Sequence, residues 1–332
     1  MNKVLLVLII IVGLGIGFGY NFYNENLTPV DNGTTKIITI EQGASSDEIG
    51  TILLENNLIK NLTVYKLYLR QSNLGSQLKA GDFEISDSLS LPEIVDLLIQ
   101  GENVVKTMNF TVPEGLNLKE IGNILSEKFD FTQEEFLKLT QTVGIYRENY
   151  EFLQDDEIKT LEGFLYPNTY NVYIDSTADD IIITMLNGFE EIYEEHIKGN
   201  TGDRTVYEIV NMASVVEGEA QVDEERPVIA GVFYNRLEMG MMLQSCATVQ
   251  YALGEKKERL LNEDLKVESL YNTYLHTGLP VAPINSPGLT SIKAALNPEE
   301  TDYIYFLAKG DGSHYFTDDY DDFLDAKAKY IN

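Results

Sequence analysis

The sequence predicts an α+β protein with a single N-terminal transmembrane helix, a small α+β subdomain and a larger mixed α/β domain. Three observations predict this fold class: an uncharged apolar run at the N-terminus, a strand–turn–helix pattern that occurs twice, and long amphipathic segments that end in a hairpin pattern. The length of 332 residues fits two domains. The expected boundaries are 1–23 for the helix, 24–35 for a polar linker, 36–106 for the subdomain and 107–332 for the larger domain.

The apolar run lies between Val4 and Tyr20, after Lys3 and before the first carboxylate, Glu25. It reaches the short end of the roughly 17–25 residues that span a bilayer. A cation before the run and acidic residues after it orient the N-terminus toward the cytoplasm. We therefore expect a single-pass membrane protein whose body lies outside the cytoplasm. A cleavable signal peptide and a buried helix are the alternatives, although Gly17-Phe-Gly19 is a poor cleavage site.

The strand–turn–helix pattern of residues 39–53 recurs in residues 111–125. Each copy has a short strand that contains a threonine, a glycine turn four residues after that threonine, and then an amphipathic helix. We expect Gly43 and Gly115 at equivalent turns, because glycine tolerates backbone angles that other residues resist. The first copy would continue through a helix at 62–72, a strand at 81–86 and a helix at 91–100.

A compact strand–helix module of this kind outside the membrane is typical of glycan-binding domains such as LysM. No aromatic platform for stacking against sugars is visible in residues 36–106. A spacer or an interaction domain therefore remains an alternative to a LysM-like glycan-binding role.

The composition excludes several classes of function. The net charge of −29 argues against nucleic-acid binding, which needs a basic surface to neutralise phosphates. The single cysteine, Cys246, permits no intramolecular disulfide. The three histidines have no metal-ligand spacing, so we expect no structural zinc, no other metal and no cofactor.

The larger domain carries helical patterns near 178–197, 205–217 and 224–239. Near the C-terminus, apolar and aromatic residues alternate along one segment, a Gly-Asp-Gly-Ser turn follows, and a second apolar segment begins at His314. This pattern predicts a hairpin.

Glu217 is the acidic residue whose position is most informative. It follows an apolar helical face, and Gly218 is expected to end that helix. The negative end of a helix dipole and apolar neighbours both favour a neutral carboxyl group. Such a group can act as a general acid on a glycosidic oxygen. With 53 acidic residues in the chain, position alone supports this role weakly, and we expect Glu219 to be solvated.

Three later segments, 243–251, 271–274 and 278–288, follow the helical pattern near 224–239, and the last two are rich in Pro, Gly, Asn and Tyr. Loops of this composition can line a cleft that binds sugars by hydrogen bonding and ring stacking. Ordinary turn chemistry and core tyrosines are the alternative interpretation. Two carboxylates that flank a bond would indicate glycoside hydrolysis, and the segment around Glu217 offers no obvious second one.

Together these segments resemble the endolytic murein transglycosylase family, also called the YceG-like family, from about residue 36 to the C-terminus. The family is similar in layout, with one membrane helix, a LysM-like subdomain and a catalytic domain outside. The chain departs from the family pattern at Cys246, where aspartate is common. The matching motifs are Ala213-Ser-Val-Val-Glu217, Val232-Phe-Tyr-Asn-Arg-Leu237, Leu243-Gln244, Tyr271-Asn-Thr-Tyr274, Gly278-Leu-Pro280, Pro287-Gly288, Glu162-Gly-Phe-Leu-Tyr-Pro167 and His314.

The resemblance implies a lyase that cuts nascent peptidoglycan strands endolytically between N-acetylmuramic acid and N-acetylglucosamine. Cleavage would need no water and would leave 1,6-anhydromuramyl ends. Glu217 would act first as acid and then as base. The implied partners are peptidoglycan, the lipid bilayer and synthases or other division or elongation proteins. The candidate glycan-binding residues are Gln244, Asn272, Tyr274 and, with weaker support, Glu162 and His314.

Two alternatives remain open. One is a non-catalytic, wall-binding scaffold of the cell-wall synthesis machinery that keeps the fold without the chemistry. The other is a hydrolytic muramidase with a second carboxylate, for which Glu162 is the first candidate. The ends of the products, anhydro or reducing, distinguish the two enzymes.

Overall fold

The computed structural model describes residues 3–30, 33–101, 104–105, 107–257 and 259–331, and of residues 3–12, 14, 16 and 104–105 it describes the backbone alone. The chain divides into two compact units, residues 1–107 and 108–332. Both units combine helices with short sheets, so the predicted α+β class is confirmed.

The first unit begins with helix α1 (Lys3–Leu27), and Tyr23 and Leu27 in its last turns pack against the core of this unit. The Tyr23 hydroxyl donates a hydrogen bond of 3.0 Å to Gln71 of α3 (Leu62–Ser72). Within the residues that the structure describes, no helix has the length and apolarity needed to cross a membrane. The transmembrane helix expected at 4–20 falls largely on residues whose side chains lie outside those described.

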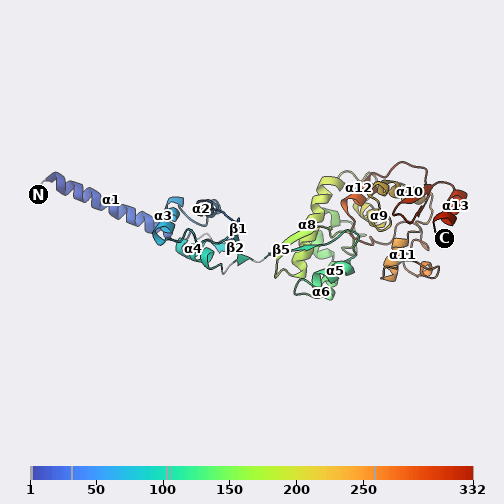
Figure 1. The fold of residues 1–332 in the computed structure, drawn as a ribbon, viewed down its shortest axis with the longest axis horizontal. Coiled ribbons are helices and arrows are strands. Elements are labelled where there is room, and N and C mark those ends of the chain that lie inside the picture. Colours follow the sequence, from blue (N-terminus) through green and yellow to red (C-terminus); the bar gives the residue numbers. More distant parts are fainter. Residues whose placement is uncertain (1–2, 31–32, 102–103, 106, 258, 332) are drawn as a thin grey trace. The chain divides into compact units, whose positions relative to one another are not determined.

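The sheet of the first unit is antiparallel, with the strand order β1-β2-β3 and with Thr35 opposite Ser86. Helices α2, α3 and α4 supply apolar side chains to one core with this sheet, in which Leu53, Tyr65, Phe83 and Ile94 are fully buried. The elements predicted at 62–72, 81–86 and 91–100 are confirmed. The bounds are β1 (Thr35–Ile40), α2 (Ser46–Glu55), β2 (Gly81–Ser86), α4 (Leu91–Gln100) and β3 (Val104–Val105) (Figure 1).

The predicted repeat is confirmed, because both copies form a strand, a turn and a helix. Gly43 has φ +90° and Gly115 has φ +73°, so both adopt the left-handed conformation that favours glycine. In each copy the helix N-cap, Ser45 or Asn117, exchanges hydrogen bonds with the glutamate three residues later. The second copy consists of β4 (Thr107–Thr111) and α5 (Leu118–Ser126).

The second unit holds the remaining helices and two two-stranded sheets. Strand β4 pairs with β5 (Thr169–Tyr173), and β6 (Tyr305–Ala308) pairs antiparallel with β7 (His314–Thr317) in the predicted hairpin. The helices are α6 (Gln133–Thr140), α7 (Gly144–Arg147), α8 (Ala178–Ile192) with a π turn at Tyr193–Ile197, α9 (Val206–Glu219), α10 (Arg226–Glu238), α11 (Cys246–Leu253), α12 (Leu289–Leu296) and α13 (Tyr320–Tyr330). Short 3-10 turns lie at Glu151–Leu153, Asp223–Glu225 and Asp264–Lys266.

Helix α9 lies at the centre of this unit, beside α10, α11 and α12 (Figure 1). Its residues from Ile209 to Val216 are buried all round, as expected of a helix enclosed by others. The helix ends at Glu219, so the expectation that Gly218 ends it is wrong. Glycine is needed at position 218 for a close approach, because a Cβ there would lie 2.5 Å from the Cβ of Ala247 in α11.

Candidate active site

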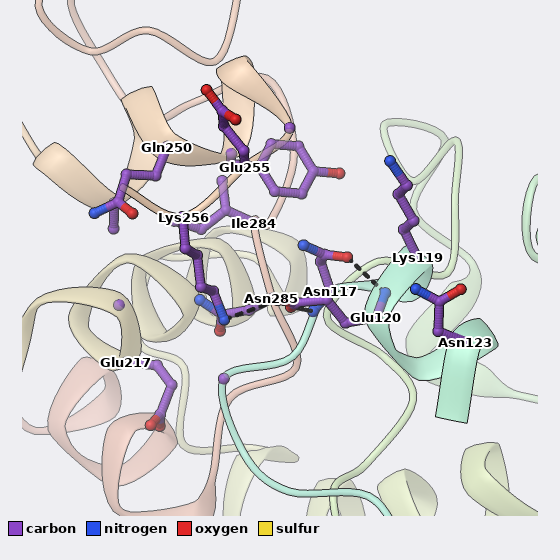
Figure 2. Close-up of a pocket in the computed structure, with 15 residues that line it drawn as sticks. Asn117, Lys119, Glu120, Asn123, Glu217, Gln250, Glu255, Lys256, Ile284 and Asn285 are labelled. Atoms are coloured by element: carbon purple, nitrogen blue, oxygen red, sulfur yellow. Dashed lines mark hydrogen bonds and ion pairs between the residues drawn. The ribbon is translucent and has the colours of Figure 1, made fainter. Parts of the chain in front are cut away.

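A cavity of about 470 Å³ lies at the C-terminal end of α9. Its walls come from α5 and the loop before it, from α11 and the segment after it, and from the loop that leads to α12 (Figure 2). Lys256, in the segment after α11, and Glu120, in α5, form an ion pair of 3.0 Å within this lining. The lining is rich in amides and charged groups, which suits a ligand with many hydroxyls: Asn117, Lys119, Glu120, Asn123, Glu217, Gln250, Tyr251, Glu255, Lys256 and Asn285.

The carboxylate of Glu217 is held through one oxygen, Oε2. This oxygen accepts hydrogen bonds from the backbone N–H of Gly288 (3.1 Å) and the hydroxyl of Ser291 (2.8 Å), and it lies 3.2 Å from Nη1 of Arg226. The Glu217 side chain is only 7% exposed. In Figure 2 the carboxylate points away from Asn117 and Glu120, and these contacts place it against the start of α12.

The other oxygen of Glu217, Oε1, lies toward the cavity. A Cβ on Gly115, which lines the cavity, would be 3.7 Å from Cγ of Glu217 and 3.9 Å from Oε1. The two oxygens are therefore unequal: donors contact Oε2, whereas Oε1 lies on the side of Gly115, one of the residues that line the cavity.

The surroundings of Glu217 differ from the sequence expectation. Apolar residues of α9 and the negative end of its dipole are present, as expected, and both favour the neutral acid. The structure adds two contacts that the sequence did not indicate: Arg226 lies 3.2 Å from Oε2, and the N–H of Gly288, at the start of α12, donates to the same oxygen. The expectation was incomplete because Arg226 begins a different helix, and the helical pattern around Glu217 carries no information about it.

Arg226 joins three elements around Glu217. Its Nε donates to Asp223 (2.9 Å), and its Nη1 donates to Ser291 (2.5 Å) as well as meeting Glu217. The Arg226 side chain is 8% exposed, so its contact with the buried Glu217 is largely shielded from water, whereas Asp223 is 67% exposed. The guanidinium is thus a buried cation that fixes Glu217 relative to α10 and α12.

His314 supports the start of α10 and does not line the cavity. Its Nδ1 lies 2.7 Å from Oε2 of Glu225, and its backbone N–H donates to the same carboxylate at 3.1 Å. Glu225 is the N-cap residue of α10 and precedes Arg226. His314 is therefore linked to Glu217 through Glu225 and the neighbouring Arg226.

Glu219 caps the N-terminus of α11. Its Oε1 accepts a hydrogen bond from the Ser245 hydroxyl and one of 3.0 Å from the backbone N–H of Ala247. The expectation that Glu219 is solvated is therefore wrong. Its role is to connect the last turn of α9 to the helix that forms one wall of the cavity.

Glu162 lies in a neighbouring site. It is 3% exposed, and it accepts hydrogen bonds from the backbone N–H of Leu118 (3.0 Å) and the hydroxyl of Tyr251 (2.9 Å). Burial raises the pKa of Glu162 to about 8, although both hydrogen bonds act in the opposite direction. Glu162 lines an adjoining cavity of about 290 Å³, which shares Asn117 and Tyr251 with the cavity of Glu217.

The raised pKa of Glu162 makes stability depend on pH. Between the ordinary value of 4.5 and about 8, the folded protein holds a proton that the unfolded chain has released, so stability falls as pH rises through this interval. Glu162→Gln keeps an acceptor for Leu118 and a polar group for Tyr251 but cannot titrate. We expect the melting temperature of the variant to fall less than that of the wild type when the pH is raised from 5 to 9. Parallel curves for the two proteins would contradict this assignment.

The three candidate glycan-binding residues lie outside the lining of the Glu217 cavity. Asn272 is fully buried; its amide donates to the carbonyls of Leu265 (3.0 Å) and Val267 (2.8 Å), which gives it a structural role in its loop. The Tyr274 hydroxyl lies 3.4 Å from Sγ of Cys246. Gln244 is exposed and has φ +51°, a conformation that few residues other than glycine adopt. Glycan binding by these residues stays a prediction.

The residues that surround Glu217 carry no clear signal in the sequence. Arg226 and Ser291 lie 9 and 74 positions away along the chain. Glu114 precedes the repeated glycine Gly115, and the repeat identified this segment as a turn without indicating a chemical role. An Arg-Pro pair at the start of a helix was the one available signal for Arg226, and it is shared with many ordinary helix starts.

The chain is similar to several known proteins. Residues 38–329 match the YceG-like family. The chain is 35% identical over 321 residues to the endolytic murein transglycosylase of Bacillus subtilis (strain 168), and the match covers 92% of this chain and 88% of that protein. It is 32% identical to the endolytic murein transglycosylase of Streptococcus pneumoniae (strain ATCC BAA-255 / R6), of which it covers 61%. A crystal structure from Listeria monocytogenes, described as YceG-like, superposes with a TM-score of 0.62 at 33% identity and covers 89% of this chain and 99% of that one.

Proposed function

The chain belongs to the YceG-like family, and from this premise we propose that it is a lytic transglycosylase that cuts peptidoglycan glycan strands endolytically. Two relatives that it matches over most of its own length carry the name endolytic murein transglycosylase. The observation that carries the assignment of the site is the buried Glu217, whose Oε1 faces a polar cavity while Oε2 is held by donors.

In the proposed reaction Glu217 performs both proton transfers. The protonated carboxyl group gives its proton to the glycosidic oxygen as the bond between that oxygen and C1 of N-acetylmuramic acid breaks. The resulting carboxylate then takes the proton of the C6 hydroxyl of the same sugar, whose oxygen bonds to C1 and closes the 1,6-anhydro ring. Glu217 ends the cycle protonated, as it began, and no water is consumed.

The contacts of Glu217 support both steps. With the proton on Oε1, the acid faces the cavity, and Oε2 remains an acceptor for Gly288 and Ser291. After the first transfer, the new carboxylate lies 3.2 Å from the Arg226 guanidinium, which stabilises the negative charge. A single carboxyl group can therefore serve as acid and as base without a change of partners.

The test of this proposal is the chemistry of the product ends. Purified peptidoglycan is digested with the full-length protein, and the fragments are analysed by mass spectrometry. We expect muramyl ends that are lighter by one water than reducing ends. Reducing ends would support the hydrolytic muramidase, and undigested strands would support the wall-binding scaffold.

We further propose that residues 4–20 anchor the protein in the cell membrane and that the rest lies outside the cytoplasm, where peptidoglycan is found. The support is the uncharged run after Lys3 and the acidic residues that follow it. A reporter that is active only outside the cytoplasm, fused after Asn332, should be active in cells. Activity of a reporter that works only in the cytoplasm would contradict the orientation, and a shorter protein in the medium would indicate a cleaved signal peptide.

Residues 36–106 are proposed as a LysM-like subdomain that positions the catalytic domain on the glycan, with a spacer role as the alternative. Synthases and other division or elongation proteins are the partners that the proposed activity requires, because an enzyme that cuts nascent strands must act where strands are made.

A further inference from the structure

The cavity beside Glu162 adjoins the cavity that contains Glu217. The two have volumes of about 290 and 470 Å³, and they share four lining residues, which are Asn117, Lys119, Tyr251 and Gly254. The proton transfers proposed for Glu217 need only the larger cavity. A strand that is cut within its length has further groups on both sides of the reacting bond, so the smaller cavity can hold a part of the substrate that does not react.

The lining of the smaller cavity suits a peptide. Amide, hydroxyl and phenol groups are combined with leucine side chains in this lining: Leu118, Leu137, Thr140, Gln141, Thr160, Tyr251 and Tyr271. A peptide needs hydrogen-bonding partners for its backbone amides and apolar surface for its alkyl groups. The wall formed by Tyr251 is held in place, because its hydroxyl donates a hydrogen bond of 2.9 Å to Glu162 and its ring centroid lies 4.6 Å from that of Tyr271.

Lys119 is an unpaired cation at the junction of the two cavities. It is exposed, and in the described part of the chain no hydrogen bond or ion pair engages its ammonium group. Lys256, the other cation that lines the larger cavity, is paired with Glu120 at 3.0 Å. In Figure 2 the Lys119 side chain points away from this ion pair and lies on the far side of the cavity from Glu217. Lys119 is therefore available to a ligand group that lies apart from the reacting bond.

The charges around the smaller cavity favour an anionic group. Among the described residues that line it, Lys119 is the one cation and Glu162 the one carboxyl group. Burial raises the pKa of Glu162 to about 8, so this group is largely uncharged in neutral solution and does not repel an anion. The net charge of −29 repels anions from most of the protein surface, so an unpaired ammonium group beside a cavity marks a place where a carboxylate can bind.

We propose that the smaller cavity is a subsite for the stem peptide of the peptidoglycan strand and that Lys119 binds a carboxylate of this peptide. The proposal rests on the proposed function, because peptidoglycan is the substrate that carries such peptides. The sugars of the strand are uncharged once the muramyl carboxyl group is joined to its peptide, so the peptide supplies the carboxylates. While the sugar lies beside Glu217, its peptide extends over the shared wall of Asn117 and Tyr251 into the smaller cavity.

The first test compares strands with free peptide carboxylates and strands whose peptide carboxylates have been converted to amides. For the full-length wild-type protein, kcat/KM should be about tenfold higher on the free carboxylates, the usual effect of one charge-assisted hydrogen bond. Lys119→Met should bring this ratio close to one, whereas Lys119→Arg, which keeps the charge, should retain most of it. Lys128→Met, at an exposed position after α5 that lines neither cavity, is the matched control and should leave the ratio unchanged.

The second test addresses the cavity itself, with strands from which an amidase has removed the peptides. Gln141 is exposed, and it lines the smaller cavity without lining the larger one. Gln141→Trp places a large ring there, which should lower the ratio of kcat/KM on peptide-bearing strands to kcat/KM on peptide-free strands by about tenfold. Glu134→Trp, at an exposed position on α6 outside both cavities, is the control and should keep the wild-type ratio.

The outcomes separate the subsite from the activity. A ratio of one for the wild type in the first test, or a ratio that Lys119→Met leaves unchanged, would overturn the role of Lys119. An unchanged ratio in Gln141→Trp would overturn the placement of the peptide in the smaller cavity. Reducing ends, or no cleavage of any strand by the wild-type protein, would instead overturn the proposed function itself.

Discussion

Glu217→Gln should lower the rate of anhydromuramyl product formation by at least about 10²–10⁴-fold, the usual effect of losing a general acid–base group. The amide cannot give a proton to the glycosidic oxygen and cannot take one from the C6 hydroxyl, so both steps of the proposed reaction lose their catalyst. The amide oxygen can still accept the hydrogen bonds of Gly288 and Ser291, which should keep the geometry of the site. Single-turnover product formation measures the effect.

The control for this experiment is Glu219→Gln, two residues further along α9. Its amide oxygen can still accept from Ser245 and Ala247, so α11 keeps its cap and most activity should remain. Glu217→Gln also removes the charge that faces Arg226, which should lower the stability by about 1–3 kcal/mol. Melting curves of both variants therefore accompany the assay. A folded Glu217→Gln protein with a rate near that of the wild type would refute the assignment.

Arg226→Met should be the most destabilising of the single changes at this site. It leaves the Glu217 carboxylate buried without its cation, and removing one partner of a buried ion pair typically costs about 3–5 kcal/mol. The free energy of unfolding, measured with denaturant, gives this cost directly. Arg70→Met, at an exposed position on α3, is the control and should change the stability by less than about 0.5 kcal/mol.

The double variant Arg226→Met/Glu217→Gln tests whether the loss of stability comes from the unpaired charge of Glu217. If the loss in the single variant comes from an unpaired charge on Glu217, then removing that charge should recover part of the stability, and the two changes should not be additive. Additive losses would show that Arg226 acts through its packing and through Asp223 and Ser291, with no energetic coupling to Glu217.

Local patterns predicted α2, α3, β2 and α4 of the first unit, the repeat and the C-terminal hairpin. Each of these elements is specified by side chains close together in sequence, such as the N-cap Ser45 and Glu48 in α2. The end of α9 was mispredicted because Gly218 is required by Ala247, which belongs to another helix. A glycine needed for a close approach looks the same in sequence as a glycine that ends a helix.

The site was predicted less completely than the fold for a related reason. Glu217 stood out because it follows an apolar helical face, which is a local feature. Its partners Arg226 and Ser291 come from other helices, and no periodic pattern connects them to it. Asn272 shows the reverse case: its loop composition suggested a ligand contact, whereas its amide holds the loop together through Leu265 and Val267.

The measurement that tests the central claim most directly is digestion of peptidoglycan in water enriched in oxygen-18. In the proposed reaction the C6 hydroxyl of the muramyl residue, and not water, attacks C1. Mass spectrometry should therefore find anhydromuramyl ends without oxygen-18, formed by the wild-type protein and absent with Glu217→Gln. Reducing ends that carry one oxygen-18 atom would show that water is the nucleophile, and they would contradict the account.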